Sequence, residues 1–340
     1  MNKKIKFLQV GLGSMGKRRI RCLLHLGIQS EQIFGFDPVP SKRTKAESEY
    51  AIKTFSNFKQ AVATVNPDVY IVSTPPDKHA PYFLFAARQK KHVFVEATTL
   101  ADGYRQLEKM QDGSFIAAAS CSWRYLPAIK KIGQLVKQGR IGKVLSFQYH
   151  MGQYLPDWHP WEDYRKVYFA KKVTGACREM FPFELVWINH ILQSSVKRIS
   201  GLVRKLSDLD MSADDLYAAV LEYKSGVVGT VSIDVLARTA LRTLRLVGTE
   251  GVLDWDWLNY QIKIFSVRKK KWQTISLRAG RAEKNYVTTE DMYQEEIKQF
   301  LDAIAGKQAY PYSFAEDQQI LNTTFALEKS SRTGKTCRVA

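Results

Sequence analysis

The sequence predicts an α/β protein with two domains: a doubly wound parallel sheet, followed by an α+β domain with a large, mostly antiparallel sheet. Its 340 residues suffice for two domains of ordinary size. In the N-terminal part, strand-like runs alternate with helix-length segments, which is typical of parallel βαβ units. Further along, strand-like runs follow one another with glycine-containing turns between them, as in an antiparallel sheet. We place the domains at residues 1–122 and 123–340, where this pattern changes.

The individual elements follow from local patterns. An apolar run at residues 5–10 leads into a glycine-rich turn and a segment whose apolar residues recur at helical spacing. Short apolar runs predict further strands at 33–36, 68–73 and 92–96, with a helix at 80–89. In the C-terminal domain we expect helices at 127–138 and from 175 to 192, and strands at 143–150, 216–223, 227–235, 241–247 and 261–267. Amphipathic helices at 292–305 and 316–330 end the chain and can pack back on the first domain.

Composition narrows the class of protein. Hydrophobic residues make up 45% and charged residues 25% of the chain, which is typical of a packed globular protein. No apolar run reaches the length that a bilayer crossing needs, and glycine appears too early for a secretory signal, so we expect a cytoplasmic protein without membrane insertion. Four scattered cysteines without C-x-x-C spacing indicate free thiols, and neither a disulfide framework nor a zinc site.

The chain is strongly basic, with a formal net charge of +18. Such a charge attracts polyanions, including nucleic acid, phosphorylated lipid and nucleotide-linked substrates. The densest basic run, 268–271, lies between two strand-like stretches, where a solvated hairpin turn explains it better than a nucleic-acid patch. We therefore expect no specific nucleic-acid partner.

A G-x-G-x-x-G motif directly follows the first expected strand and opens the first helix. In this context the first glycine makes the tight turn, the second lets the backbone approach a pyrophosphate, and the third lets helix and strand pack closely. Backbone N–H groups at the start of the helix can then bind the anion, and Asp37, at the end of the second expected strand, can accept bonds from a ribose diol. These features predict a dinucleotide-binding Rossmann domain. Its expected cofactor contacts are Gly11, Gly13, Ser14, Met15, Gly16 and Asp37.

Asp37 also favours NAD over NADP as the cofactor, since a carboxylate would repel a 2′-phosphate. Lys42 and Arg43 follow closely and can soften this preference, so NADP stays an alternative. The competing explanation for both residues is ordinary surface charge on a helix.

Further segments carry a family pattern. Residues 73–79 (STPPDKH), 91–96 (KHVFVE), 123–127 (WRYLP) and 139–144 (GRIGKV) stand in the order of known landmarks. With them the chain resembles the glucose-fructose oxidoreductase / inositol dehydrogenase / MocA family nearly from end to end. The resemblance implies a Rossmann domain, NAD(P)-dependent oxidoreductase activity and a homodimer or homotetramer. It adds to the cofactor contacts Thr74, Pro75, His79 and Glu96.

The loop of residues 152–165 (GQYLPDWHPWEDYR) is similar to a subgroup that modifies sugars in bacterial surface-polysaccharide pathways. Flat indoles stack on the apolar faces of sugar rings, and charged side chains bond hydroxyls or a phosphate. We therefore expect substrate contacts from Trp158, Trp161 and Arg165, together with Arg178. Packing of the loop on the second domain is the rival explanation for the two tryptophans.

The chain departs from the family at the residues that handle the hydroxyl proton. The resemblance implies a lysine after Glu96 and an Asp…His pair in the second domain. At the positions that align best stand Ala97 in place of the lysine, Phe183 in place of the histidine and Val186 in place of the following aspartate. Neither alanine nor phenylalanine can hold a proton, and losing such a catalyst costs roughly 10²–10⁴ in rate.

Other ionisable residues can take over proton transfer. Glu179 lies four residues before Phe183, on one face of a helix, and can face the pocket that the histidine would occupy. The competing explanation for Glu179 and Glu184 is a helix surface or an ion pair with Arg178. The family template places further donors near the substrate, so the candidate catalytic residues are Glu179, Tyr154, His159 and Arg124.

Two functions follow from this pattern. The first is an NAD(P)-dependent oxidoreductase that acts on a sugar or nucleotide-sugar in bacterial surface-glycan biosynthesis, with a non-standard proton-transfer residue. The second is a catalytically retired relative that binds the dinucleotide as a structural or sensing ligand, since three proton-handling residues are missing together. We prefer the first because the segment around Glu179 carries new ionisable residues.

Overall fold

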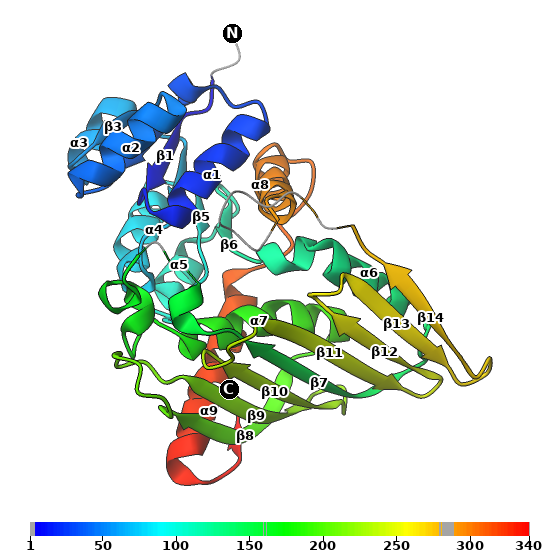
Figure 1. Ribbon diagram of the computed structural model, residues 1–340. Coiled ribbons are helices and arrows are strands. Elements are labelled where there is room, and N and C mark those ends of the chain that lie inside the picture. The colour runs from blue at the N-terminus through cyan, green and yellow to red at the C-terminus, as the bar shows by residue number, and fades with distance from the viewer. Residues whose placement is uncertain (1–3, 159, 161, 279, 281–288, 340) are drawn as a thin grey trace. The chain divides into compact units, whose positions relative to one another are not determined.

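The computed structural model contains two compact units, each with a sheet of its own (Figure 1). It describes residues 4–158, 160, 162–278, 280 and 289–339. The first unit comprises Met1–Ser122 and Glu290–Gln318, and the second Trp123–Thr289 and Gln319–Ala340. Both units are therefore assembled from two separate segments of the chain.

The first unit is built on a six-stranded parallel sheet in the order β3-β2-β1-β4-β5-β6. Its strands are β1 (Phe7–Val10), β2 (Ile33–Phe36), β3 (Lys53–Phe55), β4 (Val69–Val72), β5 (His92–Val95) and β6 (Ala117–Ala119). Its helices are α1 (Ser14–His25), α2 (Pro40–Tyr50), α3 (Phe58–Val65), α4 (His79–Arg88), α5 (Tyr104–Met110) and α8 (Asp291–Ile304). The strand order reverses beside β1, as in a doubly wound sheet, which confirms the predicted Rossmann fold.

The core of the first unit runs along its central strands. Every residue of β1 and β4 is buried, as expected for parallel strands that helices cover on both faces. This burial explains why both strands appear in the sequence as mainly apolar runs, with Gln9 of β1 as the polar exception. The carboxyl ends of the strands are the positions where such sheets bind ligands.

The second unit is built on a nine-stranded sheet in the order β14-β13-β12-β11-β7-β10-β9-β8-β15. Its strands are β7 (Val144–Gly152), β8 (Val196–Arg204), β9 (Leu216–Tyr223), β10 (Val228–Asp234), β11 (Leu241–Gly248), β12 (Gly251–Asp256), β13 (Gln261–Ser266), β14 (Lys271–Ser276) and β15 (Cys337–Arg338). Strands β7 and β10 are parallel, whereas the other neighbouring pairs are antiparallel. The predicted mostly antiparallel sheet is thus confirmed.

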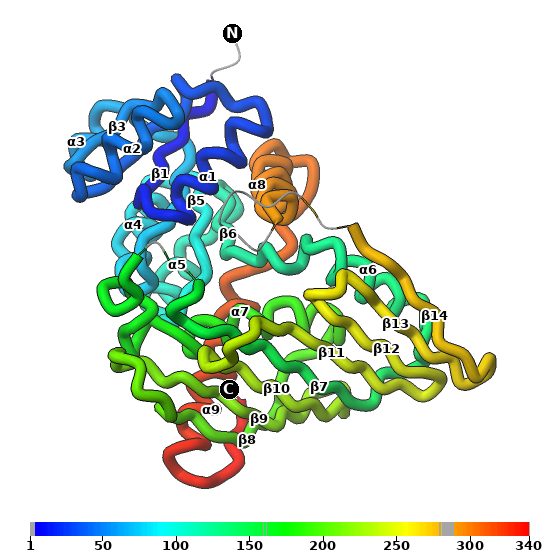
Figure 2. Tube along the Cα trace, in the orientation of Figure 1, coloured from blue at the N-terminus to red at the C-terminus, as the bar shows by residue number. Residues whose placement is uncertain are grey.

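Helices cover one face of this sheet and leave the other open. The helices are α6 (Pro127–Lys137), α7 (Cys177–Leu192) and α9 (Phe314–Thr333), as the ribbon and the Cα trace show (Figures 1 and 2). Along β7 the side chains of Phe147, Tyr149 and Met151 are buried under these helices, whereas Gln148 is exposed. This alternation is typical of a sheet with one solvated face.

The structure also bears on the basic run, the cysteines and the question of membrane-spanning helices. Strands β13 and β14 pair from Ser266↔Lys271 to Gln261↔Ser276, so the basic run forms the predicted hairpin turn. All four cysteines are buried and free, as predicted. Among the described residues, no helix is both long and apolar enough to span a bilayer.

Candidate functional site

The glycine turn after β1 is shaped by close contacts of its own backbone. Gly11 has a φ of +90°, and a Cβ there would lie 2.6 Å from the carbonyl oxygen of Ser73. A Cβ at Gly16 would lie 1.9 Å from the carbonyl oxygen of Gly11. Only glycine fits at these two positions. The buried Gln9 amide supports the turn by donating to the Gly11 carbonyl at 3.1 Å.

Gly13 differs from the other two glycines of the motif, Gly11 and Gly16, because it faces open space. Its φ of −70° and ψ of −166° suit any residue, and a Cβ there would meet no atom within 4 Å. Ser14 and Met15 follow as the first residues of α1, whose first turn contains no acidic side chain. The N–H groups of this turn have no partner within the helix and favour an anion. The turn therefore fits the pyrophosphate of a dinucleotide.

Asp37 follows β2 and is held rigidly by the backbone. Its buried carboxylate accepts the N–H of Leu12 at Oδ2 and the N–H of Val39 at Oδ1, both at 2.9 Å. Each oxygen keeps lone pairs with which it can bond a ribose diol. Two cations stand beside it: Lys42 Nζ lies 4.0 Å from Oδ2, and the Arg43 guanidinium donates to the Asp37 carbonyl oxygen at 2.8 Å.

The segment after β4 is ordered by a buried histidine. His79 Nε2 lies 2.7 Å from the carbonyl oxygen of Thr74, so this nitrogen carries the proton. Burial lowers the pKa of His79 and keeps the ring neutral at pH 7. Pro75 follows Thr74 and precedes the short helical turn Pro76–Lys78. His79 thereby fixes the backbone of the threonine-proline segment.

Glu96, which follows β5, belongs to a buried ion cluster. The fully buried Arg19 guanidinium donates to both Glu96 oxygens, at 2.6 and 2.9 Å, and lies 2.7 Å from Glu296 Oε2. One guanidinium thus contacts two carboxylates, and burial raises the pKa of Glu296. The Ser73 hydroxyl also donates to Glu96, at 3.3 Å. These contacts fix Glu96 at the carboxyl end of the sheet.

In the second unit, α7 carries the segment that was expected to replace the proton-handling residues. Glu179 is only 8% exposed and accepts a hydrogen bond from the Tyr168 hydroxyl at 2.9 Å. One turn later, the Phe183 ring packs edge-on against Trp123, with centroids 6.2 Å apart. The helix thus presents a buried carboxylate beside an aromatic ring that cannot carry a proton.

Glu184 lies in a second buried cluster that sequence reasoning missed. It is fully buried, accepts the Tyr149 hydroxyl and the Trp187 indole N–H at 2.7 Å each, and pairs with Arg242 at 3.1 Å. Burial and the adjacent Glu184 carboxylate raise the pKa of Tyr149. Arg242 also lies over the Trp123 ring, 4.2 Å from its centroid. The alternation of β11 places Arg242 at an inward position, which indicated a buried cation but did not reveal its partner.

The surface and ion-pair explanation for α7 is wrong. Arg178 pairs instead with Glu328, at 2.6 Å. Glu179 and Glu184 point into the unit, because the buried face of this helix is wide: residues 184–188 are all buried. Arg178 thus ties α7 to α9 in the second unit.

The other predicted site residues that the structure describes lie in the second unit. Arg124 is buried and donates to the Val186 carbonyl at 3.1 Å, which ties it to α7. The Tyr154 ring lies under the Arg238 guanidinium at 3.8 Å. Trp158 packs edge-on against Phe169 of the same segment between β7 and α7, with centroids 5.1 Å apart. Arg165 is exposed and pairs with Asp163 at 2.7 Å. His159 and Trp161 lie outside the described residues.

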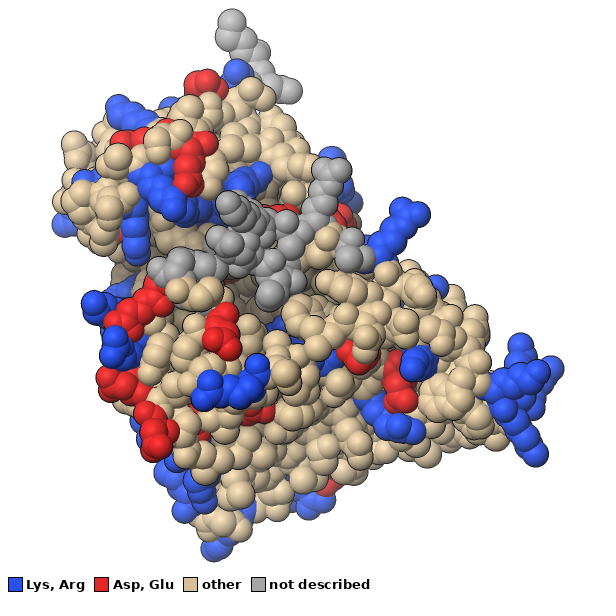
Figure 3. Space-filling view, viewed as in Figure 1, with Lys and Arg blue, Asp and Glu red and all other residues tan. Residues whose placement is uncertain are grey.

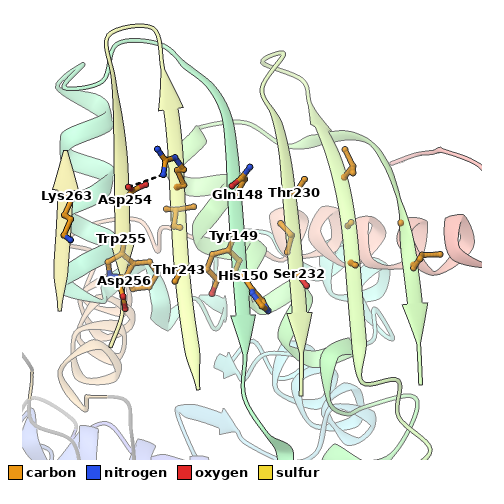
Figure 4. A pocket seen from close by; sticks show the side chains of 18 of the residues that line it. Gln148, Tyr149, His150, Thr230, Ser232, Thr243, Asp254, Trp255, Asp256 and Lys263 are labelled. Carbon is orange, nitrogen blue, oxygen red and sulfur yellow. Dashed lines mark hydrogen bonds and ion pairs between the residues drawn. The ribbon is translucent and has the colours of Figure 1, made fainter. Parts of the chain in front are cut away.

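The open face of the large sheet carries a separate cavity of about 860 Å³. Its walls include Gln148, His150, Thr230, Thr243 and Lys263, which point away from the helices (Figure 4). None of the residues predicted from the sequence lines it. Within the described part of the chain, no group of three His, Cys, Asp or Glu side chains could hold a metal ion.

Comparison with known families decides the identity of the fold. The family model of oxidoreductases with an NAD-binding Rossmann fold matches residues 5–112, and the model of the GFO/IDH/MocA C-terminal domain matches residues 129–254. The chain belongs to the GFO/IDH/MocA oxidoreductase family. The family model confirms the predicted NAD-binding Rossmann domain over residues 5–112.

Individual GFO/IDH/MocA relatives are distant. Levoglucosan dehydrogenase from Pseudarthrobacter phenanthrenivorans is 23% identical over 223 residues, which span 56% of each chain. The scyllo-inositol 2-dehydrogenase (NAD(+)) of Bacillus subtilis is 22% identical over 289 residues, or 81% of each chain. A solved structure of levoglucosan dehydrogenase in complex with NADH superposes with a TM-score of 0.84 at 17% identity and covers 99% of both chains. The match to the solved structure establishes the fold over the whole chain.

Proposed function

We propose that this protein is an NAD(P)-dependent oxidoreductase that acts on a carbinol of a sugar or nucleotide-sugar. The observation that carries the proposal is the intact cofactor cradle: an open position at Gly13, an anion-binding helix start and the rigid Asp37 carboxylate. The activities for which the relatives are named, dehydrogenation of levoglucosan and of scyllo-inositol, support a sugar or polyol as substrate. A bound nicotinamide would accept the hydride from the carbinol carbon or return it.

The proton of the carbinol needs a different route from that of the family, because Ala97 and Phe183 cannot carry it. We assign it to Glu179. A carboxylate can accept the hydroxyl proton as the hydride leaves, so that an alcohol becomes a ketone and two electrons leave with the hydride. The hydrogen bond from Tyr168 at 2.9 Å orients the carboxylate. Arg124, Tyr154 and His159 stay candidate donors to the substrate.

The loop between β7 and α7 supports a sugar more than a small acid as the substrate. It contains Trp158, Trp161 and Arg165 within eight residues, 158–165, and aromatic and charged side chains together suit sugar rings and phosphates. We further propose a role in bacterial surface-glycan biosynthesis, a cytoplasmic location and a homodimer or homotetramer. The domain boundary at residues 122/123 is retained as part of the same proposal.

The principal experiment combines cofactor binding with a substrate screen. Calorimetric titration with NAD and NADP should give measurable heat, and one or more nucleotide-sugars should then change the absorbance of reduced nicotinamide. Glu179→Gln should lower turnover by roughly 10²–10⁴ while NAD binding stays unchanged, and Tyr168→Phe should shift the pH profile of turnover. Glu316→Gln, an exposed carboxylate in the first turn of α9, serves as the control.

One observation favours a second candidate, a retired relative that binds the dinucleotide without turnover. The Phe183 ring packs edge-on against Trp123, so an aromatic contact within the second unit stands where the family histidine is expected. Restoring Ala97→Lys and Phe183→His distinguishes the two. If the wild type already turns over a sugar and the restored variant is slower, the protein is not retired; if no nucleotide-sugar reacts with a wild type that binds NAD, the retired relative is the better account.

A further inference from the structure

A strongly basic surface of the second unit contains none of the residues assigned to the proposed reaction. Residues 127–143 include five basic residues and no acidic one, and residues 257–278 include six and none. The two segments meet where the Arg140 guanidinium donates to Gln273 Oε1 at 3.1 Å. They also meet through the backbone of Glu250, which bonds Ile141 and Val267 at 3.0 Å each. We call this surface the basic edge; it consists of Lys137, Arg140, Lys143, Arg268, Lys269, Lys270 and Lys271.

The positive charge of the basic edge is not balanced locally. All seven side chains are exposed. Some exposed lysines elsewhere on the protein have carboxylate partners, for example Lys90 with Asp112 at 2.7 Å. Within the residues that the structure describes, no ion pair involves Lys137, Lys143 or residues 268–271. This surface therefore holds a concentrated part of the net charge of +18.

Protection of a sheet edge explains only a small part of this charge. Lysines on edge strands prevent sheets from pairing edge to edge, and β14 is an edge strand. Only Lys271 belongs to β14, whereas residues 268–270 lie in the turn beyond the last paired residues. Lys137, Arg140 and Lys143 lie outside the sheet altogether. An anionic partner accounts for all seven residues.

Apolar side chains beside the turn indicate which anionic partner fits. Val267 and Trp272 flank the four basic residues and are 53% and 50% exposed. The Trp272 ring packs against Phe265, with centroids 5.4 Å apart, and this contact holds the indole beside the lysines. Tryptophan sits at the headgroup level of bilayers, and lysine side chains extend to the phosphates around it. A basic turn with an exposed indole thus matches the chemistry of an anionic bilayer surface.

The form of the surface also favours a bilayer over nucleic acid. Blue atoms stand out from the tan surface at the free end of the β13–β14 hairpin (Figure 3). A projecting tip makes contact with a flat charged plane, whereas nucleic acid is held along an extended track of phosphate contacts. We propose that the basic edge docks this protein peripherally on an anionic phospholipid bilayer, with residues 267–272 at the headgroups.

Flotation with lipid vesicles tests the proposal directly. The full-length protein should bind vesicles of phosphatidylcholine mixed with phosphatidylglycerol at low salt, should be released at high salt, and should ignore pure phosphatidylcholine. Lys269→Glu combined with Lys270→Glu should lower the bound fraction at least about tenfold. Trp272→Ser should weaken binding without changing its salt dependence. Unchanged melting temperature and NAD binding would show that each variant is folded.

A matched control separates the basic edge from net charge. Lys59→Glu combined with Lys109→Glu changes the net charge equally, at exposed helix positions of the first unit, and should bind vesicles like the wild type. Equal loss in both double variants would overturn the proposal, because net charge alone would then explain binding. Binding to neutral vesicles would also overturn the proposal. If the protein bound no vesicles but bound duplex DNA through residues 267–272, the surface would be assigned to nucleic acid instead.

Discussion

Gly13→Ala separates the cofactor-binding role of the glycine turn from its structural role. The backbone of Gly13 is ordinary for alanine, and the added methyl group would meet no protein atom within 4 Å. The methyl group would therefore occupy only the space that we assign to the pyrophosphate. Gly16→Ala provides the contrast, because its methyl group would lie 1.9 Å from the Gly11 carbonyl oxygen.

The expected magnitude follows from the cost of overpacking a fitted contact, about 1–3 kcal/mol. NAD affinity of Gly13→Ala should fall roughly 5- to 150-fold, while its melting temperature without cofactor stays that of the wild type. Gly16→Ala should instead unfold at a lower temperature whether or not NAD is present, since the clash lies within the protein.

Calorimetric titration with NAD and thermal unfolding without it are the two measurements. Gly133 lies within α6 and also has open space around a Cβ position, so Gly133→Ala is a matched control. It should bind NAD like the wild type and gain up to about 1 kcal/mol of stability from helix propensity. Unchanged NAD affinity in Gly13→Ala would refute the placement of the pyrophosphate at this turn.

Three further predictions concern stability, cofactor choice and pH. Glu184→Gln removes the charge that balances buried Arg242 and should lower the free energy of unfolding by about 3–5 kcal/mol in urea titrations; a loss below about 1 kcal/mol would contradict the pairing. Arg43→Ala should weaken NADP binding and leave NAD binding unchanged in calorimetry, whereas equal losses would show that Arg43 only supports the Asp37 carbonyl. Burial lowers the pKa of His79, so below its ordinary value of 6.5 the unfolded chain takes up a proton that the folded chain excludes. The free energy of unfolding should therefore decrease as pH falls below 6.5; His79→Gln should flatten this dependence, and an unchanged slope would show that other groups cause it.

The strands that the sequence revealed are those with a strong local signal. Buried β1 and β4 are mainly apolar runs, and β9, β10 and β11 alternate cleanly. Strands β3 and β6 escaped prediction because each has three residues, and β6 consists of alanine alone. β12 was missed because Gly251, read as part of a turn, begins the strand, and two aspartates occupy its outward positions.

The cofactor cradle could be predicted because its parts are close in sequence and have fixed geometric roles. The buried clusters could not, because each joins distant segments: Glu184 and Arg242 are 58 residues apart, and Arg19 and Glu296 lie on α1 and α8. Such pairing depends on tertiary packing, which no local pattern encodes. The same limit explains why a helix surface stayed the competing explanation for Glu179, which is buried.

Residues 290–318 belong to the first unit, so a truncated chain cannot contain the whole of that unit unless it includes them. A fragment that stops at residue 122 would contain every strand of the six-stranded sheet yet lack Glu296. Arg19 would then keep a single carboxylate partner, and the surface of α1 that α8 covers would meet solvent. A soluble cofactor-binding fragment therefore calls for the two pieces to be joined by a designed linker or co-expressed, and simple truncation should yield an unstable product.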